Sequence, residues 1–184
     1  MRSSGFLGSM RRLICDQRGV SAVEFAMIAP IMIFFYFALA EFCQGFMAQK
    51  RMGHAAAMVG DLVSQSTGDI TADQVDDMFA IGDLIVKPFS ASTLTLRVTS
   101  VTRNVNDTVT VDWSKGRGMT ALAKGALVQI PANLIEDGES IVISESEFKY
   151  DSPVDYVIKD GITFSQKHYL RPRAVEKVTC TNCT

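Results

Sequence analysis

Residues 20–40 read VSAVEFAMIAPIMIFFYFALA. Folded as an α-helix, this run would be about 31 Å long, which is close to the ~30 Å hydrocarbon thickness of a bilayer. Glu24 is its one charged residue and Pro30 is its one helix breaker. A core helix of a soluble protein seldom contains an uncharged stretch as long as residues 25–40 behind a group of arginines. The sequence therefore predicts a single membrane-spanning helix.

Charge is distributed unevenly around this run. The residues before Gly19 carry a net charge of +3, from four arginines and one aspartate: Arg2, Arg11, Arg12, Arg18 and Asp16. Because the whole chain carries −2, the remainder carries −5. A basic leader ahead of the span predicts a cytoplasmic N-terminus and a periplasmic body in the bacterial inner membrane. An acidic body also argues against nucleic acid as a partner, because phosphate binding needs clustered lysines and arginines.

An ordinary cleaved secretory signal does not describe this N-terminus. Such a signal has about 7–15 apolar residues and then a small-residue cleavage site of the A-x-A kind. The run here is longer, and it continues into sequence that is compatible with a helix. A lipoprotein signal does not fit either, because Cys15 comes before the apolar run instead of after it.

Glu24 is the residue in the run that most needs an explanation. A carboxylate in a membrane segment costs a few kcal/mol and usually has a partner. Two interpretations stay open: Glu24 could reach the cytoplasmic headgroups, or it could pair with a cation near the start of the helix. Cleavage after Gly19 would create such a cation, the free ammonium group of Val20. Glu24 would then be the fifth residue of the mature chain.

The stretch R-G-V-S-A-V-E-F-A-M-I-A-P resembles the processing site of type IV prepilins, and more narrowly that of the TadE-like pseudopilins of the Tad (Flp, type IVb) pilus system. In that family a basic leader ends in glycine, a glutamate and an aromatic residue follow, and a proline lies within the helix. Gly19, Glu24, Phe25 and Pro30 occupy these places. Weaker similarities follow in the body, in W-S-K-G at residues 113–116, E-F-K-Y-D-S-P at residues 147–153 and Y-L-R-P-R-A at residues 169–174.

The resemblance implies a minor pilin or pseudopilin, a structural protein of pilus assembly and not an enzyme. It implies cleavage by a prepilin peptidase between Gly19 and Val20. The implied partners are the Tad inner-membrane assembly proteins and other pilins and pseudopilins. Glu24, followed by Phe25, would neutralise the N-terminal ammonium group of a neighbouring subunit. The alternative, from another class, is an uncleaved, signal-anchored periplasmic binding or sensor domain in which Glu24 has no special role.

The helix is expected to continue past the membrane to residue 66. Apolar residues at spacings of three and four form one stripe along it, made of Ala48, Met52, Ala55, Val59 and Leu62. Gly45, Gly53 and Gly60 lower its helix propensity but allow another surface to approach closely. That surface could belong to sister subunits or to the chain's own domain.

A second helix and about four antiparallel strands are expected after this helix. Thr71 and Gln74 form a capping-box pattern that starts the second helix, and Pro88 ends it. Alternating apolar residues predict strands at residues 94–98 and 109–113, joined as a hairpin by the turn residues between them. Two further strands and a short helix are expected at residues 139–150, 162–170 and 120–127.

The sequence offers little chemistry outside the helix start. Cys180 and Cys183 are expected to form a small disulfide, with free thiols as the second interpretation and a metal as a distant third, because half a zinc site lacks its other ligands. His54 and His168 are the two histidines, and no serine lies in a nucleophile motif such as G-x-S-x-G. No catalytic residue, metal or cofactor is predicted.

The whole sequence predicts an α+β, pilin-like protein that crosses the inner membrane once and can enter a pilus. Three segments are expected: a basic cytoplasmic leader at residues 1–19, the transmembrane helix with its periplasmic extension at residues 20–66, and a periplasmic α+β domain at residues 67–184.

Overall fold

The structure is a computed structural model that describes residues 19–131, 134–152 and 160–183. The predicted leader before Gly19 lies outside these ranges, and so does Pro153. The chain divides into two compact units, Met1–Phe42 and Cys43–Thr184. The predicted division at residues 19 and 66 describes topology in a membrane and stays a prediction.

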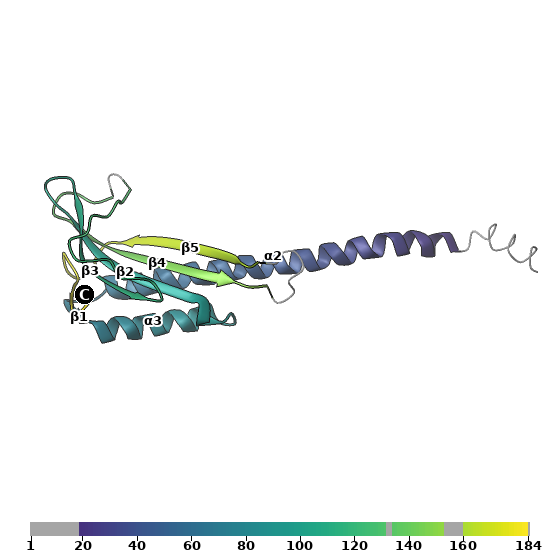
Figure 1. Ribbon diagram of the computed structural model, residues 1–184, viewed down its shortest axis with the longest axis horizontal. Helices are drawn as coiled ribbons and strands as arrows, with labels where there is room; N and C mark the ends of the chain where they lie inside the picture. Colours follow the sequence, from purple (N-terminus) through teal and green to yellow (C-terminus); the bar gives the residue numbers. More distant parts are fainter. Residues whose placement is uncertain (1–18, 132–133, 153–159, 184) are drawn as a thin grey trace, which may run out of the picture. The chain divides into compact units, whose positions relative to one another are not determined.

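A long helix, a second helix and two sheets make up the described residues (Figure 1). The elements are, in chain order, α2 (Val20–Ser64), β1 (Asp69–Thr71), α3 (Ala72–Val86), the 3-10 turn η2 (Ala91–Thr93), β2 (Leu94–Arg103), β3 (Val109–Arg117), β4 (Ser140–Tyr150), β5 (Ile162–Leu170) and β6 (Thr179–Thr181). The predicted α+β class is confirmed.

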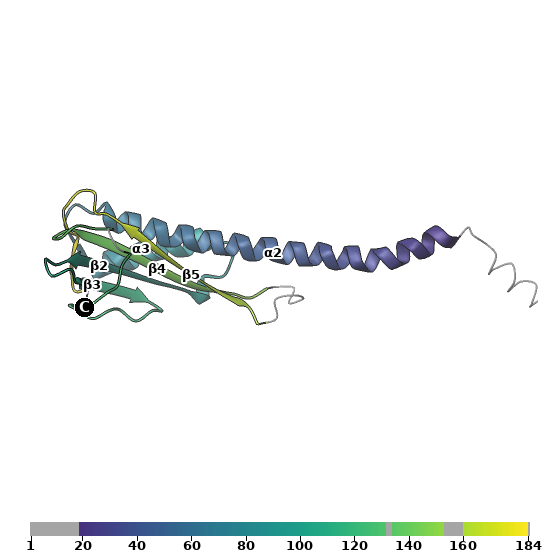
Figure 2. The ribbon, with the colours of Figure 1, turned by 90° about the horizontal axis from the view of Figure 1, so that it is seen from above.

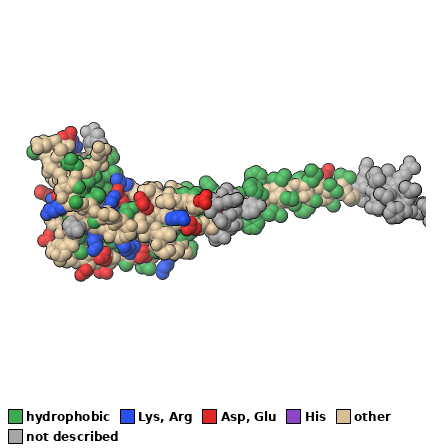
Figure 3. Space-filling model, in the orientation of Figure 1, with side chains coloured by type: hydrophobic (Ala, Val, Ile, Leu, Met, Phe, Trp, Pro, Cys, Tyr) green, Lys and Arg blue, Asp and Glu red, His purple; other side chains and the backbone are tan. Residues whose placement is uncertain are grey.

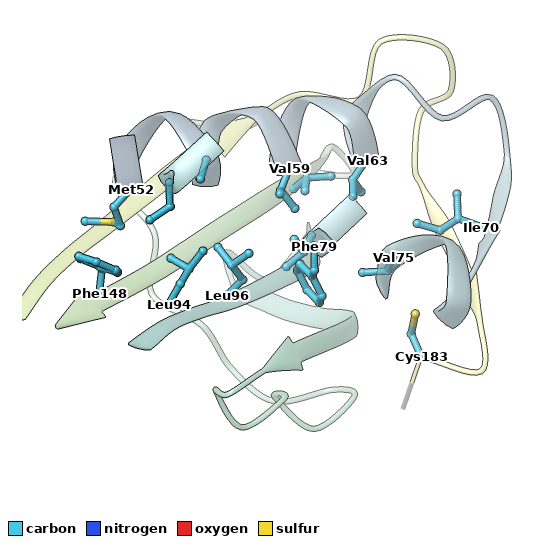
Figure 4. Close-up of a cluster of buried hydrophobic side chains, with 14 of the residues drawn as sticks. Met52, Val59, Val63, Ile70, Val75, Phe79, Leu94, Leu96, Phe148 and Cys183 are labelled. Atoms are coloured by element: carbon cyan, nitrogen blue, oxygen red, sulfur yellow. The ribbon is translucent and has the colours of Figure 1, made fainter. Parts of the chain in front are cut away.

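Helix α2 includes Pro30 and continues far beyond the apolar run, as predicted. Its predicted stripe is buried at Ala48, Met52, Ala55 and Val59, and Val63 is buried next along the helix. These side chains meet α3 and one face of the main sheet in a common core. Figure 4 shows side chains of α2 pointing toward those of β2 and β4.

Helix α3 begins at the predicted capping box. The backbone N–H of Gln74 donates to the hydroxyl of Thr71 at 3.3 Å, and the side-chain carbonyl of Gln74 accepts from the backbone N–H of Thr71 at 2.9 Å. The helix ends at Val86, just before Pro88, which cannot continue a helix. Val75, Phe79 and Val86 turn one face of α3 into the core.

The main sheet has four antiparallel strands in the order β3-β2-β4-β5 (Figure 2). This confirms the predicted hairpin and both further strands. A second sheet, which the sequence pattern did not predict, pairs β1 with β6 in parallel. The indole Nε1–H of Trp113 donates to the backbone carbonyl of Val178 at 2.8 Å and holds the segment before β6 against β3.

The register of the β2–β3 hairpin changes once. This change separates Trp113 from Val109 and Val111, although their alternation in the sequence predicts one shared face of the sheet. Ser100 pairs with Trp113 and Val101 pairs with Val111, so Asp112 is an extra residue in β3. Trp113 consequently joins the core between the helices and the sheet, which we call the helix-facing core. Val109 and Val111 join a second cluster, which also contains Val101, Ile135, Ile141 and Ile143.

The predicted short helix at residues 120–127 is wrong. The chain there lies along the free edge of β3, where the N–H of Gly125 donates to Val111 and the N–H of Val128 donates to Val109. Gly125 has φ of +79°, a backbone conformation that a helix excludes. Leu122, Ala126 and Val128 cover the second cluster, whose burial outweighs the helix propensity of the segment.

Gly60 lies where α2 approaches the chain's own sheet most closely. A Cβ at this position would be 2.6 Å from Cδ1 of Leu170 and 2.9 Å from Cβ of Ser144. The hydroxyl of Ser144 also donates to the carbonyl of Ala56 at 2.7 Å. Of the two surfaces considered for this glycine, the structure places the chain's own domain against it.

We therefore expect Gly60→Ala to destabilise the folded chain by about 1–2 kcal/mol, because the overpacking outweighs the gain in helix propensity. Gly53→Ala in the same helix is the matched control, since its Cβ would meet only Cγ of Gln166 at 3.7 Å. This control should keep or raise stability. Thermal unfolding of the detergent-solubilised chain, followed by near-ultraviolet circular dichroism, measures both. Equal melting temperatures for the two variants would contradict the close-packing argument.

Candidate functional site

The candidate processing bond lies at the start of α2. Gly19 comes immediately before the helix and Val20 is its first residue. Both residues are exposed, and a Cβ added at Gly19 would meet no atom of the described residues within 4 Å. The first turn of a helix has backbone N–H groups without intrahelical partners, so it unwinds more easily than the interior. The bond between Gly19 and Val20 is thus open to a large partner.

Glu24 and Val20 are four residues apart in α2, and the helix therefore places them on the same face. Glu24 is exposed, and 72% of Phe25 is exposed beside it. If Val20 carried a free ammonium group, the helix start would present a cation and an anion on one exposed face.

Apolar side chains surround the helix beyond this pair. Large exposed side chains follow one another between Val23 and Leu39 on every face of the helix. The helix is long and apolar enough to cross a membrane, and its most apolar window has a mean hydropathy of 2.1. Figure 3 shows hydrophobic side chains over this segment. Such a surface is stable only when lipid or other apolar helices cover it.

The comparison with known families agrees with this helix start. Residues 19–61 match the family described as TadE-like protein. Over these residues the chain is similar to the TadE-like family. None of the curated proteins and none of the solved structures matches the chain. The match begins at Gly19 and covers Glu24, Phe25, Pro30 and the extension of α2, and TadE-like pilins are structural proteins, not enzymes.

The other similarities to TadE-like sequences lie outside the matched segment, where the structure gives them packing roles. Trp113 is buried, and Gly116 leaves room for the carbonyl oxygen of Met119, which a Cβ would meet at 2.1 Å. Phe148 and Tyr150 are buried in the helix-facing core. Arg173 pairs with Asp61 at 2.6 Å and joins the last segment to α2.

The structure joins Cys180 and Cys183 by a disulfide bond, and their oxidation in the cell stays a prediction. The bond closes a short loop within the C-terminal segment. That segment is held on the domain by the burial of Cys183 in the helix-facing core and by the pairing of β6 with β1. Cys43 is a free, exposed thiol on α2.

The two histidines lie on opposite walls of one hollow of about 330 Å³, between α2 and β5. His54 is exposed, while Nε2 of His168 is buried and has no hydrogen-bond partner among the described residues. Sequence reasoning did not bring them together, because the pairing of β4 with β5 sets which residue of β5 meets α2. Within the described ranges, no three His, Cys, Asp or Glu side chains gather as a metal site.

Glu145 forms two ion pairs within the main sheet, with Arg97 and Lys167. Its carboxylate accepts from Nε of Arg97 at 2.7 Å and lies 2.7 Å from Nζ of Lys167, and only 13% of its side chain is exposed. Burial alone would raise the pKa of Glu145, but the hydrogen bonds from Lys167 and Arg97 outweigh it and hold the pKa below its ordinary value of 4.5. The cluster joins β2, β4 and β5.

A lowered pKa means that the folded chain favours the charged form of Glu145. The charged carboxylate of Glu145 therefore stabilises the fold fully when the pH is above 4.5, the ordinary pKa. This stabilisation is lost as the pH falls through the lower pKa that Glu145 has in the folded chain. We expect Glu145→Gln to lower the melting temperature at pH 7 and to have little effect at about pH 3. Glu147→Gln, at an exposed position of the same strand, is the control. If Glu145→Gln lowered the melting temperature equally at both pH values, the stabilisation by the charged form of Glu145 would be refuted.

Proposed function

We propose that this chain is a minor pilin or pseudopilin that takes part in assembly of a Tad, type IVb-like pilus. The single observation that carries the proposal is the TadE-like match from residue 19 onward, which begins at the glycine before an exposed apolar helix. An ordinary membrane anchor has no need for a glycine at this junction or for a glutamate five residues later. The site supports processing by a prepilin peptidase after Gly19.

In this mechanism α2 holds the subunit in the inner membrane until assembly. The +3 leader stays in the cytoplasm and the domain from about Glu41 onward lies in the periplasm. Glu24 of one subunit neutralises the new N-terminal ammonium group of a neighbour. An unpaired charge of either sign is costly among packed apolar helices, so this pairing selects one axial position. The partners are the peptidase, the Tad inner-membrane proteins and other pilins.

The proposal is tested by the mass of the native protein. We expect the chain extracted from its host membrane to begin at Val20, so that residues 1–19 are missing from the intact mass. The extracted chain should also bring other pilins with it in a mild detergent. A chain that keeps Arg11 and Arg12 would refute processing and support an uncleaved, signal-anchored binding or sensor domain.

A further inference from the structure

An exposed stripe on α2 continues past the apolar run into the second unit. Its members are Cys43, Phe46, Met47, Lys50 and His54, which recur at helical spacings of three and four and are all exposed. Phe46 is 51% exposed and Met47 is 46% exposed. Glu41 does not lie on this stripe, because its helical spacing places it on the face of Ala48 and Met52, which are fully buried.

The length of α2 would allow this stripe to lie in a membrane surface. From Val20 to Met47 the helix measures about 42 Å, which exceeds the ~30 Å hydrocarbon core but fits the ~40–45 Å of core and headgroup layers together. The apolar stripe ends at Lys50, whose ammonium group lies 5.3 Å from the ring centre of Phe46. A lysine with an apolar stem and a charged end is suited to the headgroup layer.

The hollow beside Lys50 has the chemistry of an anion site. Its walls include five side chains that can donate hydrogen bonds: Gln49, Lys50, His54, Gln166 and His168. Among the described residues that line it, none is acidic. The buried Nε2 of His168 has no partner among the described residues.

We infer that α2 remains in the membrane surface as far as Lys50, with Phe46 and Met47 among the outer-leaflet lipids and with a phospholipid phosphate bound in the hollow beside Lys50. The inference rests on the proposed membrane anchoring and deepens it. Lipid is the occupant because the stripe is continuous with the span along one helix and ends in a cation beside a donor-lined hollow. The membrane boundary consequently lies near Lys50 instead of Glu41.

Cys43 provides the probe for this inference. The full chain, with Cys15→Ser in this and every other labelled variant, is labelled at the Cys43 thiol with a bimane fluorophore. It is then reconstituted in vesicles of phosphatidylcholine and phosphatidylglycerol, with or without bromine on the acyl chains. We expect brominated lipid to remove at least about half of the fluorescence, because the label would lie within the bilayer. The control is a bimane on Val105→Cys in a Cys43→Ser background, at an 83% exposed loop position, which should not be quenched.

Two further results decide the inference. If the chain resists extraction from the vesicles by alkali but the label at Cys43 is not quenched, the inference is overturned. If alkali extracts the chain from the vesicles, the proposed membrane anchoring itself fails. Lys50→Glu should reduce the quenching in vesicles that contain phosphatidylglycerol, because the new carboxylate is repelled by the anionic headgroups. Lys124→Glu, on an exposed loop, should not. Equal quenching in both variants overturns the phosphate assignment.

Discussion

Gly19→Leu is expected to leave essentially the whole population as uncleaved precursor. The carbonyl carbon of Gly19 forms the candidate scissile bond, and a peptidase that holds the backbone closely there has no room for a branched side chain. The substitution should not disturb the folded domain, because an added Cβ at this position would meet none of the residues that the structure describes within 4 Å. Intact-mass measurement should show the full 184-residue chain at normal abundance in the membrane.

Gly68→Leu is the matched control for this experiment. Gly68 is also a glycine whose added Cβ would meet nothing within 4 Å, but it lies in the loop before β1. The control should be processed like the wild-type chain. If Gly19→Leu were also cut before Val20, the glycine would have no role in recognition and the bond would have to be recognised by other residues.

Local signals in the sequence were sufficient to predict most of the elements. The capping box at Thr71 depends on residues three positions apart, and period-two patterns are properties of single strands. The two main-sheet strands after residue 138 consequently fall where the pattern placed them. These features depend on residues that are close together in the sequence, so they can be predicted from the sequence alone.

Contacts between distant segments could not be predicted in the same way. The extra residue Asp112 turns Trp113 to the other face of the sheet, although Val109, Val111 and Trp113 alternate perfectly in the sequence. The parallel pairing of β1 with β6 joins segments more than a hundred residues apart. The helix expected at residues 120–127 does not form, because side chains of this segment instead cover the second cluster.

The candidate site is a different case, because its residues are neighbours in the sequence. Gly19, Val20, Glu24 and Phe25 could all be named from the junction of the basic leader with the apolar run. The end of the membrane surface was harder to place, since Glu41 interrupts the apolar run. Helical spacing removes that charge from the exposed stripe, which continues through Phe46 and Met47.

Glu24→Gln is expected to separate processing from assembly. Glutamine keeps the size and hydrogen bonding of the side chain but removes the charge, while the bond between Gly19 and Val20 is unchanged. The side chain is exposed on α2, so the fold should not change. Loss of a carboxylate from the membrane-spanning segment also makes membrane insertion easier. The variant should therefore be abundant, begin at Val20 and remain in the membrane.

Its expected defect is a severe loss of piliation and of co-purification with other pilins. An ammonium group that has lost its partner among packed helices costs about 3–5 kcal/mol, which is enough to reduce assembly by more than about a hundredfold. Glu24→Asp keeps the charge on a shorter side chain and should restore part of the assembly. Pili counted by electron microscopy, together with the intact mass of each variant, measure both steps. Normal piliation by Glu24→Gln would show that Glu24 merely reaches the headgroups, and the pairing with the Val20 ammonium group would have to be abandoned.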